Sequence, residues 1–221
     1  MKKEWTEEEL KEVASQLSLP KGEAGIKTGE RMALSNENMI ARTIASLQLT
    51  ADEKVLEIGQ GNGSHIALLM ESATGLHYIG TDISVTMIEE ATRINDALLS
   101  SGSVAFALSD GEHLDFPADT FQKIFTVNTL YFWKDPKAYA AEIYKVLKPG
   151  GRFCIAFAAK EFMEQLPFTK WEFQLYTAEM LCELLEEAGF HILEIIEEKD
   201  NTQSNLGTTV QRDIVIVAAG K

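Results

Sequence analysis

Three glycines, Gly59, Gly61 and Gly63, alternate directly after a short apolar run and before a helical pattern. Glycine is required where the chain turns tightly or where a ligand lies against bare backbone, because a Cβ atom would fill that space. Dinucleotide-binding proteins need a third glycine three positions after the second, but Ser64 and Ile66 stand where it would have to be. The turn therefore favours a nucleoside ligand without a pyrophosphate.

Asp82 is the second residue with a predicted binding role. It follows a predicted strand over 76–81 and lies about 20 residues beyond Gly61, where a carboxylate can accept hydrogen bonds from a ribose diol. The pattern therefore indicates a nucleoside with free ribose hydroxyls. A second interpretation makes Asp82 the N-cap of a helix over 84–100, and the two roles are compatible.

Polar residues also follow the next two predicted strands. Asp110 comes after the strand 104–108 and could accept a hydrogen bond from the exocyclic amine of adenine, although Asp-Gly by itself predicts only a turn. Asn128 comes after the strand 121–127, where an amide could meet polar groups at the other end of the ligand. Ligands of open α/β sheets lie beyond the carboxyl ends of the strands, so we expect all four features at one edge of the sheet.

Alternating apolar runs and helical patterns predict the elements that position these residues. Asp135 and Pro136 are typical of an N-cap and a first helical residue, and the Pro-Gly-Gly at 149–151 is expected to end that helix and lead into a strand. The predicted strands are 54–58, 76–81, 104–108, 121–127 and 152–157, and the predicted helices are 64–73, 84–100 and 136–147.

The last third of the chain has a different pattern. Thr177 is the predicted N-cap of a helix that ends before Gly189. Two apolar runs, 191–197 and 210–218, predict strands, and the polar connection between them favours an antiparallel pair at the edge of the sheet. The prediction is therefore a sheet of about seven strands.

The first part of the chain is predicted to cover the sheet. Apolar residues recur at helical spacing in 10–17 and in 40–47, which predicts two amphipathic helices. The segment 20–38 between them has a mixed pattern and is predicted to be irregular. We expect 1–45 to form a helical lid and 46–221 to form the ligand-binding domain.

Composition excludes several classes of function. The chain has 20 Lys and Arg against 34 Asp and Glu, a formal net charge of -14 with no basic stretch. Nucleic-acid binding depends on clustered basic residues, and an acidic membrane surface would repel this chain. Cys154 and Cys182 both lie in apolar settings and are predicted to be free thiols. With no signal peptide or membrane span in the pattern, we expect a cytoplasmic protein.

Taken in order, the motifs VLEIGQGNG, YIGTDIS, ALSDGEHLDFPADTFQKIFTVNTLYF, YKVLKPGGRF and EEAGF resemble the class I S-adenosylmethionine-dependent methyltransferases. The resemblance extends over roughly residues 50–221 and is nearest to the small-molecule branch that includes ubiquinone/menaquinone-type methyltransferases. It implies an α/β, Rossmann-like, doubly wound sheet of seven strands, mostly parallel with the last strand antiparallel, beneath the N-terminal helical lid.

The resemblance also implies roles for individual residues around S-adenosyl-L-methionine. The residues around the methionine part would be Glu57, Gly59, Gly61, Gly63 and Asn128. The ribose hydroxyls would be held by Asp82, and the adenine would contact Ile83, Asp110 and Gly111. Gln60 departs from the family, which often has a small residue there, but its side chain could point away from the ligand.

The implied reaction is methyl transfer to a nucleophilic O, N, S or C atom of a small organic molecule. Tyr131 and Trp133, with Phe132 between them, are predicted to contact this acceptor, although the same residues could form an apolar plug under the lid. No catalytic residue is assigned, because a base is not required and His113, the one candidate, more commonly has a solvated role. We predict no metal site, and the sequence leaves the oligomeric state open. The alternatives are an NAD(P)-linked oxidoreductase and a non-catalytic nucleoside-binding module.

Overall fold

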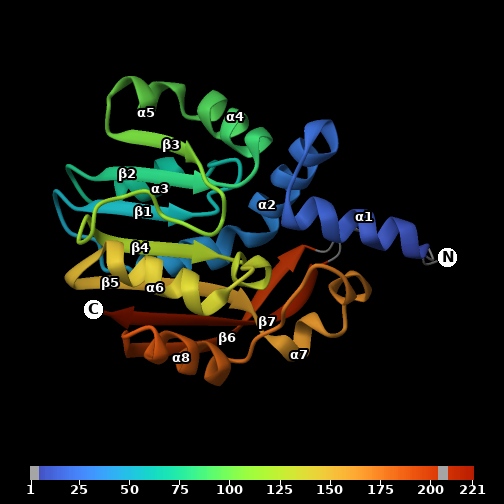
Figure 1. Ribbon diagram of the computed structural model, residues 1–221. Helices are drawn as coiled ribbons and strands as arrows, with labels where there is room; N and C mark the ends of the chain where they lie inside the picture. Colours follow the sequence, from blue (N-terminus) through green and yellow to red (C-terminus); the bar gives the residue numbers. More distant parts are fainter. Residues whose placement is uncertain (1–4, 204–208) are drawn as a thin grey trace.

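The computed structural model describes residues 5–203 and 209–221 (Figure 1). Its strands are β1 (Lys54–Ile58), β2 (His77–Asp82), β3 (Val104–Leu108), β4 (Phe121–Val127), β5 (Leu147–Ala158), β6 (His191–Gln203) and β7 (Thr209–Gly220). Its helices are α1 (Glu7–Ser18), α2 (Gly22–Ser46), α3 (Ile66–Glu71), α4 (Val85–Ile94), α5 (Asp96–Ser100), α6 (Pro136–Val146), α7 (Lys160–Met163) and α8 (Ala178–Glu187), with 3-10 turns η1 (Leu130–Phe132) and η2 (Pro167–Lys170).

The seven strands form one sheet in the order β3-β2-β1-β4-β5-β7-β6. β1 pairs in parallel with both β2 and β4, so the chain order reverses at the β1–β4 boundary, the position where open α/β sheets bind ligands. β7 lies between β5 and β6 and is antiparallel to both. The predicted doubly wound, Rossmann-like α/β fold with an antiparallel last strand is confirmed.

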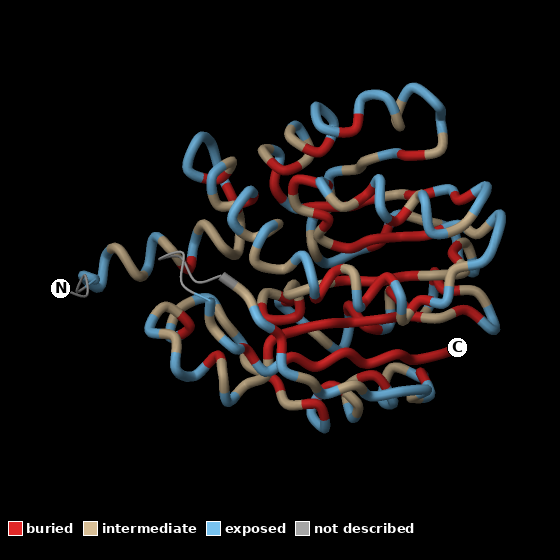
Figure 2. The backbone as a smooth tube through the Cα atoms, turned by 180° about the vertical axis from the view of Figure 1, so that it is seen from behind, coloured by how far each residue is buried: buried red, intermediate tan, exposed pale blue. Residues whose placement is uncertain are grey.

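Helices cover both faces of the sheet. α6 and α8 pack on one face, where Ile143, Leu181 and Leu185 are fully buried in one apolar cluster. The C-terminal half of α2 and α3 pack on the other face, where Ile44 and Ile66 belong to a second cluster. The strands between them are the buried centre of the molecule (Figure 2). Each fully buried large apolar side chain contributes about 1.5–3 kcal/mol to folding, so this double covering stabilises the sheet.

Side-chain caps set the start of four helices. Thr6 forms a capping box with Glu9 at α1, and Asp135 accepts a hydrogen bond from the Ala138 N–H at α6, with Pro136 in the first turn. Ser84 and Thr177 cap α4 and α8 in the same way. The caps predicted at Asp135 and Thr177 are confirmed, since a side-chain oxygen there satisfies an N–H that the helix itself leaves unpaired.

The prediction of an irregular segment over 20–38 is wrong, because α2 is one continuous helix through this region. Its glycines permit close packing. A Cβ atom on Gly25 would lie 2.6 Å from the Pro20 carbonyl carbon, and one on Gly29 would lie 2.8 Å from the Met87 sulfur. Tertiary contacts thus override low intrinsic helix propensity. The expected boundary between 45 and 46 falls in the last turn of this helix.

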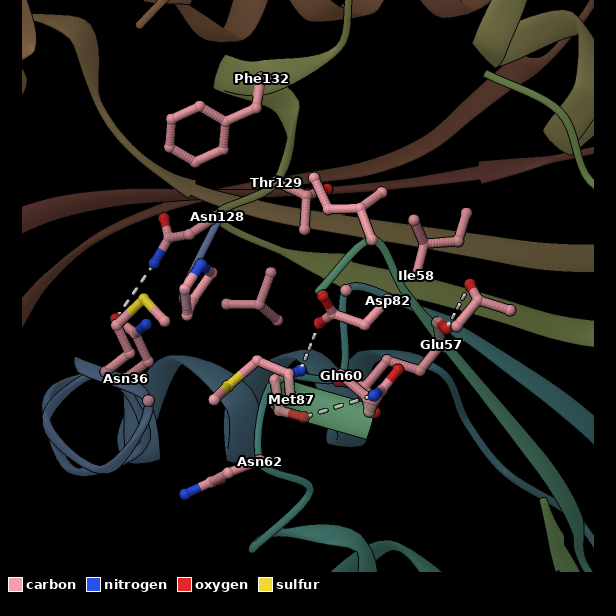
Figure 3. Close-up of a pocket in the computed structure, with 18 of the residues that line it drawn as sticks. Asn36, Glu57, Ile58, Gln60, Asn62, Asp82, Met87, Asn128, Thr129 and Phe132 are labelled. Carbon is pink, nitrogen blue, oxygen red and sulfur yellow. Dashed lines mark hydrogen bonds between the residues drawn. The ribbon is translucent and has the colours of Figure 1, made fainter. Parts of the chain in front are cut away.

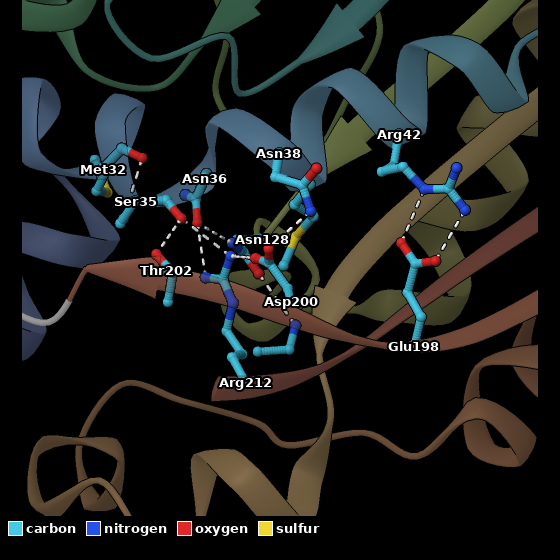
Figure 4. Close-up of polar contacts among 12 residues, drawn as sticks. Met32, Ser35, Asn36, Asn38, Arg42, Asn128, Glu198, Asp200, Thr202 and Arg212 are labelled. Atoms are coloured by element: carbon cyan, nitrogen blue, oxygen red, sulfur yellow. Dashed lines mark hydrogen bonds and ion pairs between the residues drawn. The ribbon is translucent and has the colours of Figure 1, made fainter. Parts of the chain in front are cut away.

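The C-terminal hairpin is also longer than predicted. The polar connection 198–209 was expected to be a loop, but β6 continues to Gln203 and pairs with β7 residue by residue from Lys199 to Gln203. The rest of that connection, 204–208, lies outside the described residues. The extension is stable because its polar side chains face α2 and bind it (Figure 4). Arg42 of α2, for example, makes two hydrogen bonds to the Glu198 carboxylate.

Other boundaries differ in smaller ways. The helix predicted over 84–100 is split at Asn95, whose Nδ2 group donates to the carbonyls of Gly63 and Ala91 at 3.0 and 2.9 Å. The N-cap of α4 is Ser84, so the interpretation of Asp82 as that N-cap is wrong. The helix predicted over 64–73 is only α3, and the Pro-Gly-Gly at 149–151 lies within β5.

The cysteine prediction holds: Cys154 is buried, Cys182 is partly buried, and both are free. Burial raises the pKa of the Cys154 thiol to about 11, so the thiol stays protonated and packs as an apolar group.

Within the described part of the chain, no helix has the length and apolar character that crossing a membrane requires.

Candidate functional site

A pocket that is partly open to solvent lies at the carboxyl ends of β1, β2 and β4 (Figure 3). Its floor is built from the strand ends and the loops after them, with Met87 of α4 and Tyr139 of α6. Its opposite wall is built from the end of α1, Pro20 and α2. The floor residues are Glu57, Ile58, Gly59, Gln60, Gly61, Asn62, His65, Thr81, Asp82, Ile83, Met87, Ser109, Gly111, Val127, Asn128, Thr129, Phe132, Trp133 and Tyr139, and the opposite wall is Leu17, Ser18, Pro20, Gly29, Met32, Ala33, Asn36 and Ile40.

The three glycines after β1 have different reasons to be glycine. All three have positive φ angles, which side chains with a Cβ adopt only with strain. A Cβ atom on Gly59 would lie 2.3 Å from the Thr129 Cγ2 atom, whereas one on Gly61 would meet nothing within 4 Å. Gly61 thus presents open backbone to the pocket, as a ligand-binding turn requires. Gly63 lies outside the pocket lining and packs against Asn95 instead.

Asp82 lies at the centre of the pocket floor. Its two carboxylate oxygens accept hydrogen bonds from the backbone N–H groups of Gly61, at 3.0 Å, and Ser84, at 2.8 Å. The carboxylate therefore holds the glycine turn in place. Burial raises the pKa of Asp82 to about 6, and the nearby Glu57 charge adds to the rise, while the two N–H groups oppose it. Each oxygen retains a lone pair for a further donor, as a ribose diol would supply.

Glu57 is almost fully buried below the turn. Its Oε2 atom accepts a hydrogen bond from the Tyr78 hydroxyl and lies 2.8 Å from the His65 Nε2 atom. Burial alone would lower the pKa of His65, but the Glu57 carboxylate outweighs burial and raises it. The family resemblance placed Glu57 by the methionine part of the ligand, and the side chain does line the pocket. The Tyr78 and His65 contacts were not predicted.

Gln60 does not point away into solvent. Its side chain is 3% exposed and lines the pocket, with Nε2 donating to the Gly61 carbonyl at 3.3 Å. Among the described residues, its buried Oε1 atom has no hydrogen-bond partner. A buried amide oxygen without a donor is costly, so this atom is a position where a ligand or water N–H or O–H group would be stabilised.

The loop after β3 brings only part of its predicted set to the pocket. Gly111 lines it, as does Ile83 after β2. Asp110 does not: its carboxylate accepts hydrogen bonds from the Glu112 and His113 N–H groups and pairs with the His113 ring at 2.8 Å. Those bonds lower the pKa of Asp110 and raise that of His113. The adenine role of Asp110 stays a prediction, and His113 lies outside the pocket lining.

Asn128 follows β4 and lies beside Asn36 of α2. Its φ angle of 59° is in the left-handed region, which Asn tolerates better than most residues. Its Oδ1 atom accepts from the Ala158 N–H at 3.3 Å and from the Tyr131 hydroxyl at 3.1 Å. Its Nδ2 group donates to the Asn36 Oδ1 atom at 3.0 Å. Both the strand end and the lid therefore determine how this amide is oriented.

The aromatic run after Asn128 divides between pocket and core. Phe132 and Trp133 line the pocket, and the Trp133 Nε1–H donates to the Thr129 hydroxyl at 3.2 Å. Tyr131 is outside the lining, since its hydroxyl is buried against Ala158 and burial raises its pKa. Direct contact of Tyr131 with an acceptor, the predicted role, would require a different side-chain position from the one the structure has.

Several pocket residues were not predicted, chiefly from α2. Ala33 and Asn36 were not assigned to a site because 20–38 gave no helical pattern, and Ile40, in the helix predicted over 40–47, was given no role in the pocket. The described lining holds no Lys or Arg, and its titratable side chains are Glu57, His65, Asp82 and the phenol of Tyr139. In residues 5–203 and 209–221, no group of three or more His, Cys, Asp or Glu side chains is placed to hold a metal ion.

Comparisons with known proteins agree on one family. A family model described as a methyltransferase domain matches residues 56–155. The O-methyltransferase resE of Aspergillus sclerotiorum is 26% identical over 181 residues, which cover 79% of this chain and 68% of the relative.

Two solved structures share the fold over most of the chain. A chain from the complex between the Haloferax volcanii Trm112 methyltransferase activator and the putative methyltransferase has a TM-score of 0.73 at 16% identity, covering 95% of this chain and 97% of that chain. An S-adenosylmethionine-dependent methyltransferase from Aquifex aeolicus has a TM-score of 0.63 at 21% identity, covering 86% of this chain and 91% of that chain.

Proposed function

Because this chain belongs to the class I S-adenosylmethionine-dependent methyltransferases, we propose that it methylates a nucleophilic atom of a small, uncharged organic molecule with an apolar body. The family assignment sets aside an NAD(P)-linked oxidoreductase and a non-catalytic nucleoside-binding module. The nearer resemblance to ubiquinone/menaquinone-type enzymes stays a prediction.

The pocket floor fits the cofactor. Gly61 leaves its backbone open to the pocket, and Asp82 beside it keeps lone pairs free for the ribose hydroxyls. Ile83 and Gly111 extend the floor toward β3, where the adenine would lie, and Asn128 lies at the opposite end with Glu57. When bound there, S-adenosylmethionine supplies a methyl group activated by the sulfonium. The binding roles of the individual residues are part of the proposal.

The chain's own contribution is to orient the two ligands and exclude water. The wall from α2 closes over the floor with Met32, Ala33 and Ile40, which are apolar and bring no group that could activate water. The carboxylates of Glu57 and Asp82 are already engaged, by Tyr78, His65 and two backbone N–H groups. We therefore propose that the acceptor presents its own nucleophile and that no side chain of the described lining acts as its general base.

The charge of the described lining supports an uncharged acceptor, and this observation carries the proposal. Its acidic side chains are Glu57 and Asp82, its one histidine, His65, is already paired with Glu57, and it has no Lys or Arg that could pair with an anionic acceptor. Desolvating an unpaired carboxylate or phosphate in such a pocket is strongly unfavourable. Phe132 and Met32, on opposite walls, give an apolar acceptor a surface to contact. We propose that residues 1–45 form a lid, because Leu17, Pro20, Met32 and Ile40 line the wall of the pocket opposite the strand ends.

The test uses acceptor pairs that differ in one charge. Methyl transfer from labelled S-adenosylmethionine is measured with methyl 4-hydroxybenzoate against 4-hydroxybenzoate, 2-naphthol against 3-hydroxy-2-naphthoate, and methyl anthranilate against anthranilate. The neutral member is expected to have a kcat/KM at least about tenfold higher, which corresponds to about 1.4 kcal/mol. Equal rates within pairs, or faster transfer to the anionic members, would contradict the proposal.

A further inference from the structure

We propose that Arg212 and Asp200, from the β6–β7 hairpin, fix the orientation of the Asn36 amide so that its NH2 group is presented to the carboxylate of bound S-adenosylmethionine. Asn36 is then a cofactor-binding residue from the lid, and Arg212 and Asp200 are positioning residues that do not touch the ligand. The inference rests on the proposed placement of the cofactor in this pocket and does not depend on the acceptor.

Two donors determine which way the Asn36 amide points (Figure 4). The Arg212 Nη1 group lies 2.9 Å from the Asn36 Oδ1 atom, and a guanidinium can only donate. The Asn128 Nδ2 group donates to the same oxygen at 3.0 Å. The Ala158 N–H donates to the Tyr131 hydroxyl at 2.7 Å and also lies 3.3 Å from the Asn128 Oδ1 atom, a contact that only the oxygen of the Asn128 amide can accept. The Asn36 oxygen must therefore face Arg212 and Asn128, and its NH2 group must face the other way.

The NH2 group of Asn36 is available to a ligand. Asn36 lines the pocket, and within the described part of the chain its Nδ2 atom donates no hydrogen bond. Its neighbour Asn128 lies where the methionine end of the cofactor is expected. The cofactor's carboxylate must find N–H or O–H donors there, because the described lining has no Lys or Arg. A neutral amide donor meets that need without adding a charge.

Arg212 is held firmly enough to act as the fixed partner. It is 7% exposed, and its Nη2 group donates to the Asp200 carboxylate at 2.5 Å and to the Ser35 carbonyl at 3.1 Å. Asp200 is 1% exposed and accepts a second hydrogen bond from Asn38 at 2.8 Å. Thr202 also donates to the Ser35 carbonyl, at 2.6 Å. The hairpin thus holds the turn of α2 that carries Asn36.

The test compares two ligands that differ only in the carboxylate. S-adenosylhomocysteine has it, and S-adenosyl-3-thiopropylamine is the same molecule without it. Asn36→Ala is expected to weaken binding of S-adenosylhomocysteine by about 10- to 100-fold, the range for a hydrogen bond to a charged group. Binding of S-adenosyl-3-thiopropylamine should change by less than about twofold, because it lacks the partner of the deleted donor. Isothermal titration calorimetry measures both.

Asn36→Asp sharpens the same test. It keeps an oxygen for Arg212 and Asn128 to donate to, so folding is preserved, but it removes the NH2 donors and should show the same selective loss. Arg212→Lys keeps a cation beside Asp200 but loses the planar donor pair, so a smaller selective loss is expected. Arg42→Lys is the matched control: it alters the exposed Arg42–Glu198 pair between the same helix and the same hairpin, and should leave both affinities unchanged.

Equal weakening of both ligands by Asn36→Ala and Asn36→Asp would show a general effect on the lid and overturn the proposal. Unchanged affinity for S-adenosylhomocysteine would also overturn it, and a raised KM for the acceptor in that case would assign the donor to the acceptor instead. A wild-type protein that bound neither ligand would refute the placement of the cofactor itself, which is a separate failure.

Discussion

The two sides of the pocket are built by opposite means. The floor is local: the Gly59–Gly63 turn follows β1 directly, Asp82 is the last residue of β2, and Gly111 lies in the loop after β3. Both hydrogen bonds to the Asp82 carboxylate come from nearby backbone N–H groups. The lid side is assembled from distant parts of the chain, since Asn36 in α2 meets Asn128 after β4 and Arg212 in β7. These two contacts of Asn36 are side chain to side chain, between residues 92 and 176 positions apart in the sequence.

This difference has consequences for how each side tolerates change. On the floor, the glycine backbone already forms the turn and side chains add contacts to it. Loss of such a side chain should therefore affect ligand binding more than folding. On the lid side, Asp200 and Arg212 are both buried, and each depends on the other for its charge partner. Removing one of them leaves the other charge without a partner, so the first effect should be on stability.

The largest expected effect is on the lid side. Arg212→Met leaves the Asp200 carboxylate buried without its cation and should lower the free energy of unfolding by about 3–5 kcal/mol. Urea unfolding measures it. Arg42→Met is the control on the same helix, and because the Arg42–Glu198 pair is largely exposed, its loss should be below about 1 kcal/mol. Equal losses from the two variants would show that burial does not distinguish the two pairs.

An intermediate effect is expected on the floor. Asp82→Ala should weaken binding of S-adenosylhomocysteine by about 1.5–3 kcal/mol, the scale for hydrogen bonds to a charged group, while the protein stays folded. Calorimetric titration gives the dissociation constant, and thermal unfolding checks the fold. An unchanged dissociation constant would remove Asp82 from the site. A large fall in melting temperature would show instead that its bonds to the Gly61 and Ser84 N–H groups matter mainly for folding.

The smallest effect is the pH dependence of the floor, and its sign is distinctive. The pKa of Asp82 is raised to about 6, chiefly by burial. In the proposed site it is the ionised form that accepts the ribose hydroxyls, so affinity for S-adenosylhomocysteine should fall as the pH drops below 6, by up to about tenfold, or 1.4 kcal/mol, per pH unit.

Stability without ligand should change in the opposite direction. A carboxyl group whose pKa is higher when folded stabilises the fold most below its unfolded pKa, and this contribution is lost as the pH rises through about 6. Asp82→Asn should remove both effects. They are measured as the difference between wild type and variant in titrations and urea unfolding from pH 5 to 8, because His65 also titrates nearby. A dissociation constant that is flat with pH in the wild type would contradict the raised pKa.

Much of the floor was predictable from the sequence. The glycine spacing, Asp82 and Asn128 were located from residue type and position along the predicted strands, and Ile83 and Gly111 from the family resemblance. Each of them is at the pocket except Gly63, which packs against Asn95. The reason is that parallel strands place their carboxyl ends together, so a residue's position at the end of a strand also fixes its position at one edge of the sheet. Asp110 was located equally well along the chain, but its side chain bonds to His113.

The sequence by itself determined the fold class, the antiparallel last strand and the glycine turn at the pocket, because helical periods, alternating apolar runs and glycine spacing are local signals. Only the tertiary structure decided that 22–46 is one helix and that β6 extends to Gln203. Each of these segments is too polar or too rich in glycine to predict its own structure. Each is stabilised by the other, through Asn36, Asn38 and Arg42 on one side and Arg212, Asp200 and Glu198 on the other. Contacts between polar residues that are far apart in the sequence leave no periodic pattern, so they cannot be predicted from the sequence. They form only once the chain has folded.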